Sequence, residues 1–155
     1  MARAYIERAK LSRRLKGNRA TSPQKPFALS VKDSMYAYVQ AEEGVPKADA
    51  SLLFKRVACN SSLPAGKLRA KLIPDSSWKR AGKRLGPQAS QTTARVDHIL
   101  SIAERIWGNE ADATAWLNTS HPELRGETPV TLLKTEAGGR AVESLLAALD
   151  YGFPV

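Results

Sequence analysis

The last third of the chain, residues 96–155, carries a repeat of apolar residues that favours one kind of secondary structure. Apolar side chains recur there at steps of three and four residues, which places them on one face of an α-helix. The first stripe consists of Val96, Ile99, Leu100, Ala103, Ile106 and Trp107, and the second of Val142, Leu145, Leu146 and Leu149. Two amphipathic helices in 60 residues must bury their stripes against each other or against further helices, so the pattern predicts an all-α fold.

Capping residues divide this region into four helices. Gly108 is expected to end the first helix, because glycine readily adopts the positive φ of a helix end. The following three helices have a start signal each: Asn109 with Asp112 three residues later, Thr128 followed by Pro129, and Thr135. Ser90 is expected to cap the long helix that ends at Trp107.

Positive charge is unevenly distributed along the 155 residues, whose net charge is +9. Residues 1–32 hold nine Lys and Arg against one Glu, and residues 67–95 hold eight against one Asp. Residues 96–155, in contrast, hold four against nine Asp and Glu. Such an asymmetry predicts two different partners, one of them anionic.

The remaining bulk features favour a cytoplasmic protein. Cys59 is the single cysteine, so an internal disulfide is excluded, which suits a reducing compartment. No apolar run reaches the roughly 20 residues that a membrane span needs, and the basic N-terminus lacks the apolar stretch of a secretory signal.

The basic segment 1–32 has two interpretations. It is either a solvated tail or an arm that contacts DNA phosphates beside a main site. A helix is expected from Asp33, and another over residues 48–59. The second of these helices supplies five expected core residues, which are Leu52, Leu53, Phe54, Val57 and Ala58. Cys59 is expected to pack as a small hydrophobe.

Two short helices around a tight turn are predicted next. Residues 64–72 form the first, with Leu68 and Leu72 inward, and Ile73-Pro74-Asp75 form the turn, with Asp75 as a cap. Residues 76–84 form the second, which is rich in Lys and Arg. This layout is typical of a helix-turn-helix, whose second helix reads DNA.

The DNA-binding residues follow from that layout. Hydroxyls and amides at the start of the second helix can hold phosphate, and its cations can reach base edges or backbone. The predicted DNA-binding residues are Lys71, Ser76, Ser77, Lys79, Arg80, Lys83 and Arg84, supported by Lys67 and Arg69. Trp78 is left with two interpretations, a DNA contact or a core anchor.

Catalytic and metal-binding patterns are not found in the sequence. His98 and His121 lie 23 residues apart with no Cys, His or Glu partner at metal spacing, and both are expected to be solvated. Trp107 and Trp116 are assigned to packing. We therefore expect neither an enzyme nor a cofactor.

Residues 96–155 resemble the C-terminal toxin-binding domain of Xre/ParS/MbcA-type antitoxins. The resemblance rests on the pairs Trp107-Gly108 and Trp116-Leu117, on the spacing of Pro122, Leu124, Gly126 and Pro129, and on Leu132-Leu133, Thr135, Gly138, Val142, Leu145-Leu146 and Tyr151-Gly152. In that family an Xre-like helix-turn-helix precedes the toxin-binding domain, and Ile73-Pro74 with Ser77-Trp78 and Arg80 resembles its turn. The resemblance implies a basic tail (1–32), a helix-turn-helix domain (33–95) and a toxin-binding domain (96–155).

The same resemblance implies a function. The chain would neutralise a RES-domain toxin that consumes NAD by covering its active site with the C-terminal segment, and would repress its own promoter as a dimer. The toxin-binding residues would be Leu149, Asp150, Tyr151, Gly152, Phe153, Pro154 and Val155. Two alternatives remain open: a plain helix-turn-helix regulator whose C-terminal helices only dimerise, and a tail whose Tyr151 and Phe153 fold back on their own helices.

Overall fold

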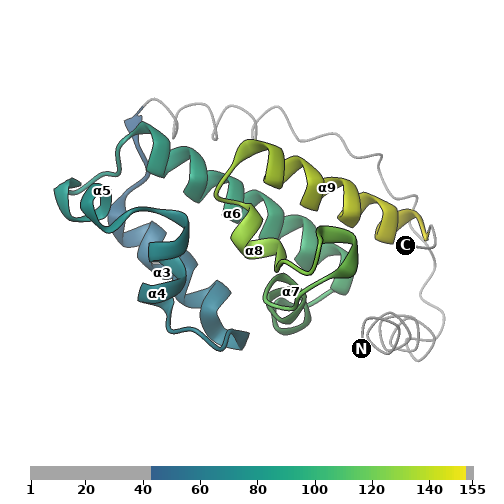
Figure 1. The fold of residues 1–155 in the computed structure, drawn as a ribbon. Coiled ribbons are helices and arrows are strands. Elements are labelled where there is room, and N and C mark those ends of the chain that lie inside the picture. Colours follow the sequence, from purple (N-terminus) through teal and green to yellow (C-terminus); the bar gives the residue numbers. More distant parts are fainter. Residues whose placement is uncertain (1–42, 153–155) are drawn as a thin grey trace.

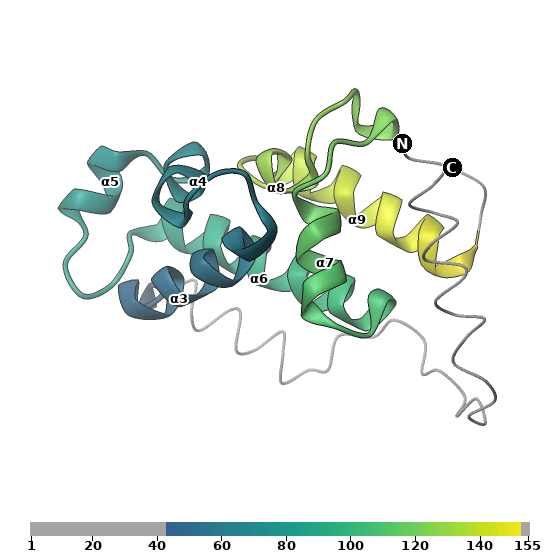
Figure 2. The same cartoon turned by 90° about the horizontal axis from the view of Figure 1, so that it is seen from below.

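One long helix, α6 (Pro87–Trp107), runs through the molecule, and the other helices pack around it (Figures 1 and 2). The computed structural model describes residues 43–152, and every named element in that range is helical. The all-α prediction is therefore confirmed. The basic tail, the helix expected from Asp33 and the last three residues, Phe153, Pro154 and Val155, lie outside the described residues.

The ends of α6 follow from glycine and proline. Pro87 occupies the first helical position, where its missing N–H needs no partner, and Gly108 ends the helix at φ 74° as predicted. The predicted cap at Ser90 is wrong, because the helix begins three residues earlier and Ser90 is buried inside it. Its hydroxyl accepts a hydrogen bond from the Val45 N–H (3.0 Å) and donates one to the Leu85 carbonyl (3.1 Å). Ser90 therefore ties the incoming chain to the helix.

Helices of the first half gather at the N-terminal end of α6 (Figure 1). They are α3 (Lys47–Val57), the 3-10 turn η1 (Ala58–Asn60), α4 (Ala65–Leu72) and α5 (Asp75–Arg80). Leu68 and Leu72 point inward as predicted. The expectation for Leu52 is wrong, since it is 60% exposed, and Cys59 is exposed rather than packed.

The second predicted DNA-binding helix is shorter than expected. It begins at Asp75, which is its first residue and not its cap, and ends at Arg80 because Ala81 adopts an extended conformation. Lys83 and Arg84 therefore lie on the segment that returns to α6, where Arg84 forms an isolated β-bridge with Pro46. Gly82, which weakens helix formation, marks this break.

Four elements gather around the C-terminal part of α6. They are α7 (Glu110–Leu117), the 3-10 turn η2 (Pro122–Leu124), α8 (Pro129–Leu132) and α9 (Glu136–Tyr151). The predicted caps at Asn109 and Thr135 are confirmed, because their side chains accept from the N–H groups of Asp112 (2.8 Å) and Gly138 (3.0 Å). Thr128 precedes Pro129 as predicted, but its side chain makes no cap bond.

A continuous core joins the two groups of helices. Buried apolar residues extend from Val45 to Leu146 in one cluster. Helix α9 lies beside α6 and runs in the same direction (Figure 1), with His98 Nε2 3.5 Å from a carboxylate oxygen of Glu143. Among the described helices, none is long and apolar enough to cross a membrane.

Candidate functional sites

The predicted DNA-binding residues cluster at the end of the molecule where α4 and α5 meet. Lys71, Ser76, Lys79 and Arg80 are exposed, and Ser77 is half-buried. Lys83 and Arg84 are exposed on the return segment. Helix α5 and the start of α6 border a concave surface of about 460 Å³ that includes Ser77, Arg80, Arg84 and Gln88. Most of the predicted set therefore faces solvent at one end of the fold.

Three of the predicted cations already have partners within the chain. Arg80 Nε donates to the Ser76 carbonyl of its own helix (3.3 Å). Arg84 donates to the Gly44 carbonyl (2.6 Å) and lies 3.7 Å from the Glu43 carboxylate. Arg69, whose side chain is only 14% exposed, pairs with Asp75 at 2.6 Å. The Arg69–Asp75 pair links α4 to the first residue of α5, so it orients the shorter helix.

Trp78 packs against the core and has two cations near its ring. It is half-buried against the hydrophobic core. The Lys47 ammonium lies 5.3 Å from its ring centroid and the Arg69 guanidinium 4.8 Å. Such cation–π contacts are attractive and favour this position of the ring. Of the two interpretations of Trp78, the structure supports the core anchor.

At the other end of the molecule, α9 presents the start of the predicted toxin-binding segment. Leu149 is half-buried against the core, and Asp150 is half-buried beside it. Tyr151 is 74% exposed, and Gly152 leaves the helix at φ 73°. The described part of the segment is thus on the surface; Phe153, Pro154 and Val155 lie outside the described residues.

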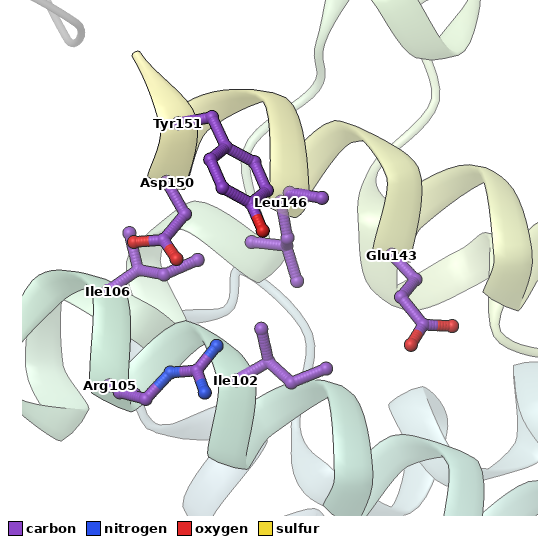
Figure 3. A pocket seen from close by; sticks show the side chains of 8 residues that line it. Ile102, Arg105, Ile106, Glu143, Leu146, Asp150 and Tyr151 are labelled. Atoms are coloured by element: carbon purple, nitrogen blue, oxygen red, sulfur yellow. The ribbon is translucent and has the colours of Figure 1, made fainter. Parts of the chain in front are cut away.

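A groove lies between α6 and α9 beside this segment (Figure 3). Its volume is about 170 Å³. Apolar side chains of both helices line it, with charged residues and a tyrosine at the margins: Ile102, Arg105, Ile106, Glu143, Leu146, Ala147, Asp150 and Tyr151. The α9 residues recur at steps of three and four, so they form one face of the helix.

Polar contacts connect the two groups of helices. Arg56 of α3 reaches Glu104 of α6 (2.7 Å) and Glu110 of α7 (3.1 Å). The hydrogen bond to Glu110 raises the pKa of the Arg56 guanidinium above its ordinary value, against an opposing effect of partial burial. Asn118 donates to the Val57 carbonyl (2.8 Å), and Asn60 donates to the Thr114 hydroxyl (2.8 Å). We call these contacts of Arg56, Asn60 and Asn118 the joint.

The joint was not foreseen from the sequence. Its partners are 48 to 61 residues apart, and no local pattern relates them. The groove was missed for the same reason, although its α9 face is visible as a helical repeat.

His121 lies in an aromatic cluster with Trp116 and Trp107. His121 is buried, which contradicts the expectation of a solvated residue: its Nε2 lies 3.1 Å from the Trp116 carbonyl and its ring stacks on Trp116 at 4.9 Å. Trp107 in turn lies 5.1 Å from Trp116, which confirms packing for both tryptophans. Within residues 43–152, no group of three or more His, Cys, Asp or Glu residues is placed to hold a metal ion.

The described residues thus form an all-helical body with a basic end and a group of C-terminal helices on one shared core. Residues 103–152 match the model of the antitoxin Xre/MbcA/ParS C-terminal toxin-binding domain. Residues 103–152 are thus identified with this toxin-binding domain, and the comparisons support an antitoxin of the Xre/MbcA/ParS type.

Two curated relatives agree with that match. One is "Antitoxin Xre" of Pseudomonas putida, 30% identical over 88 residues that make up 55% of each chain. Another is "Antitoxin Xre" of Yersinia enterocolitica, 31% identical over 97 residues, which are 59% of this chain and 66% of the relative. The chain therefore spans between about half and about two-thirds of the length of these relatives.

Proposed function

We propose that the protein is the antitoxin of a type II toxin–antitoxin system and neutralises a RES-domain toxin that consumes NAD. The match of residues 103–152 to a toxin-binding domain carries this proposal. The identification of the toxin as a RES-domain protein rests on the family resemblance. The chain acts in the cytoplasm by binding, without catalysis and without a cofactor.

The C-terminal segment, residues 149–155, covers the toxin's active site in this proposal. Helix α9 presents the start of this segment, because Leu149 packs on the core and Tyr151, 74% exposed, lies at the margin of the groove. An aromatic ring with a hydroxyl suits a pocket that otherwise holds a flat nucleotide base. Asp150 adds a negative charge near cationic groups that would receive the phosphates of NAD. Pro154 limits the conformational entropy lost when the segment docks.

A truncation tests this proposal. A chain that stops after Asp150 is expected to copurify weakly or not at all with the toxin encoded beside it, and to leave NAD unprotected in a depletion assay. The matched control is Arg140→Ala, at the exposed start of the same helix, where Arg140 pairs with Glu136 one turn away. That control is expected to protect NAD like the unaltered chain.

Two outcomes separate the possibilities. Full protection by the truncated chain would refute the role of the segment and move inhibition to residues 109–149. Absence of any complex with the unaltered chain would refute the antitoxin function and favour a plain regulator whose C-terminal helices dimerise. Circular dichroism of each variant establishes that the helices are intact.

We also propose that the basic end binds the promoter of the chain's own operon, which makes the protein an autorepressor. The proposed contacts are those that the sequence predicts: Lys71, Ser76, Ser77, Lys79, Arg80, Lys83 and Arg84. The exposure of Lys79 and Arg80 on α5 supports the proposal, as does the charge of residues 67–95. A short recognition helix gains affinity from paired half-sites, so the protein binds as a homodimer.

A further inference from the structure

The groove between α6 and α9 has the size and chemistry of a site for one aromatic ring. Its floor is apolar, formed by Ile102 and Ile106 of α6 and by Leu146 and Ala147 of α9. Figure 3 shows the side chains of Ile102, Ile106 and Leu146 converging on this space. An apolar cavity of about 150 Å³ is large enough to bind benzene. The groove, at about 170 Å³, is similar in volume.

Helix α9 ends at a glycine in the left-handed conformation. Gly152 has φ 73°, and its N–H donates to the carbonyl of Leu149 (3.3 Å) and faces that of Ala148. Both bonds are those of a helix that ends in a left-handed glycine. In such endings the residue after the glycine often makes an apolar contact with a residue three or four positions before the last one. Those positions are Ala147 and Ala148, and Ala147 lines the groove.

The residue after the glycine is Phe153, the first of the apolar tripeptide Phe153-Pro154-Val155. Proline disfavours the helical conformation in the residue before it, so Phe153 is not expected to extend α9. Its attachment begins two residues from Tyr151, which borders the groove. A ring held that close reaches the groove at a high effective concentration, unlike a second molecule.

We propose that in the free protein Phe153 folds back and places its ring in the groove formed by Ile102, Ile106, Leu146 and Ala147. The occupant is the chain's own C-terminal segment. Docking of the ring removes apolar surface of the segment and of the two helices from water, which the hydrophobic effect favours.

Docking has a consequence for inhibition, which rests on the proposed function. If the segment must leave the groove to enter the toxin, the apparent dissociation constant of the complex is raised by the inverse of the undocked fraction. A segment docked about 90% of the time would weaken toxin binding about tenfold. The groove would then set the affinity of the antitoxin without contacting the toxin.

Methyl NMR on the free, full-length chain tests the docking itself. The chain has five isoleucines, of which Ile102 and Ile106 line the groove and Ile73 lies at the other end of the fold. With Ile methyl labelling, we expect nuclear Overhauser contacts from the Phe153 ring to the methyl groups of Ile102 and Ile106. Phe153→Ala should shift both signals while leaving that of Ile73 unchanged.

A matched pair of variants on α9 provides the control. Ala147→Trp fills the groove from its own wall and should abolish the contacts of Phe153. Ala141→Trp places the same side chain at another exposed position of the helix and should preserve them. Both positions are exposed, so both variants are expected to fold.

Two results would overturn the proposal. One is the absence of contacts between Phe153 and the two isoleucines in the unaltered chain. The other is a contact seen only between labelled and unlabelled molecules, which would assign the groove to a second copy. Neither measurement involves the toxin, so failure here is distinct from failure of the truncation assay above.

Discussion

Gly138, one of the residues that carry the family resemblance, has a steric reason to be glycine. It follows the Thr135 cap at the start of α9, where the chain has just left α8. A Cβ at Gly138 would lie well inside van der Waals contact of the Leu132 carbonyl oxygen. A Cβ at Gly139 would instead meet the Arg95 side chain, which donates to the Leu133 carbonyl at 2.7 Å. The two glycines are therefore not equivalent.

We predict that Gly138→Ala destabilises the fold by up to about 2 kcal/mol. Alanine gains roughly 1 kcal/mol of helix propensity over glycine, but overpacking against a backbone carbonyl costs up to about 3 kcal/mol. Gly139→Ala should cost about 1 kcal/mol or less, because a side chain can move away. Urea unfolding measures both, with Gly66→Ala in α4 as the control, since nothing lies within 4 Å of a Cβ there. Equal effects at 138 and 139 would contradict the backbone clash.

Trp78 shows that the composition of a helix does not settle the role of each residue. Among the cations of this basic region, Lys47 and Arg69 are placed over its ring. Lys47 also donates to the Ala81 carbonyl at 3.1 Å, just where α5 ends. The ring and its two cations thus hold a six-residue helix that is too short to be stable alone.

Replacing Trp78 should therefore affect stability before it affects DNA. We predict that Trp78→Ala costs about 2 kcal/mol, less than a fully buried tryptophan would, because the side chain is half-buried. Trp78→Phe, which retains a ring, should cost about half as much. Lys79→Ala is the neighbouring control and should change the free energy of unfolding by less than about 0.5 kcal/mol. A Trp78→Ala variant of normal stability would mean that the ring does not anchor α5.

At the scale of helices, the joint decides how the two groups are held together. Arg56 supplies charge, but its side chain is 44% exposed, so solvent screens its pairs with Glu104 and Glu110. Asn118 is less exposed and donates to two carbonyls, those of Val57 and Thr114. Neutral hydrogen bonds therefore matter more here than the ion pairs.

We predict that Asn118→Ala destabilises the fold by about 1–2 kcal/mol, because it leaves a part-buried carbonyl without its donor. Arg56→Ala should cost less than about 1 kcal/mol, and that cost should shrink at 1 M salt. Thermal unfolding at low and high salt compares the two. A larger, salt-insensitive loss for Arg56→Ala would reverse the assigned order.

At the scale of the whole molecule, the basic and acidic regions lie at opposite ends of α6 but share one core. The buried cluster runs from Val45 to Leu146 without a break. A continuous core makes the two proposed binding surfaces parts of one body. The boundary predicted at residue 95 falls inside α6, which spans Pro87–Trp107.

DNA binding should depend on the basic end alone. If about six phosphates are neutralised, affinity should fall roughly a thousandfold between 50 and 200 mM salt. Substitution of Lys79, Arg80 and Lys83 together by alanine should abolish operator binding in a gel-shift assay and leave toxin neutralisation intact. The control removes three charges elsewhere, at the exposed residues Lys55, Lys134 and Arg140. Equal losses in the two triple variants would show that net charge, and not this surface, drives binding.

The elements that the sequence predicted depend on neighbours along the chain. The caps at Asn109 and Thr135 act over three residues, and the stripes of α6 and α9 repeat every three or four. Gly108 ends α6 through its own φ. Such features are local, so the sequence alone determined the helices of the C-terminal half and the all-α class.

What only the tertiary structure decided depends on residues far apart in the chain. The residue type of Ser90 predicts a cap, but its bond with Val45, 45 residues away, determines its role. His121 is buried because Trp116 covers it, and Lys83 leaves the helix because the chain must return to Val45, where the Lys83 carbonyl accepts from Lys47 (2.9 Å). The groove exists only because α6 and α9 lie side by side. Packing places these partners together, and no periodicity in the sequence encodes that placement.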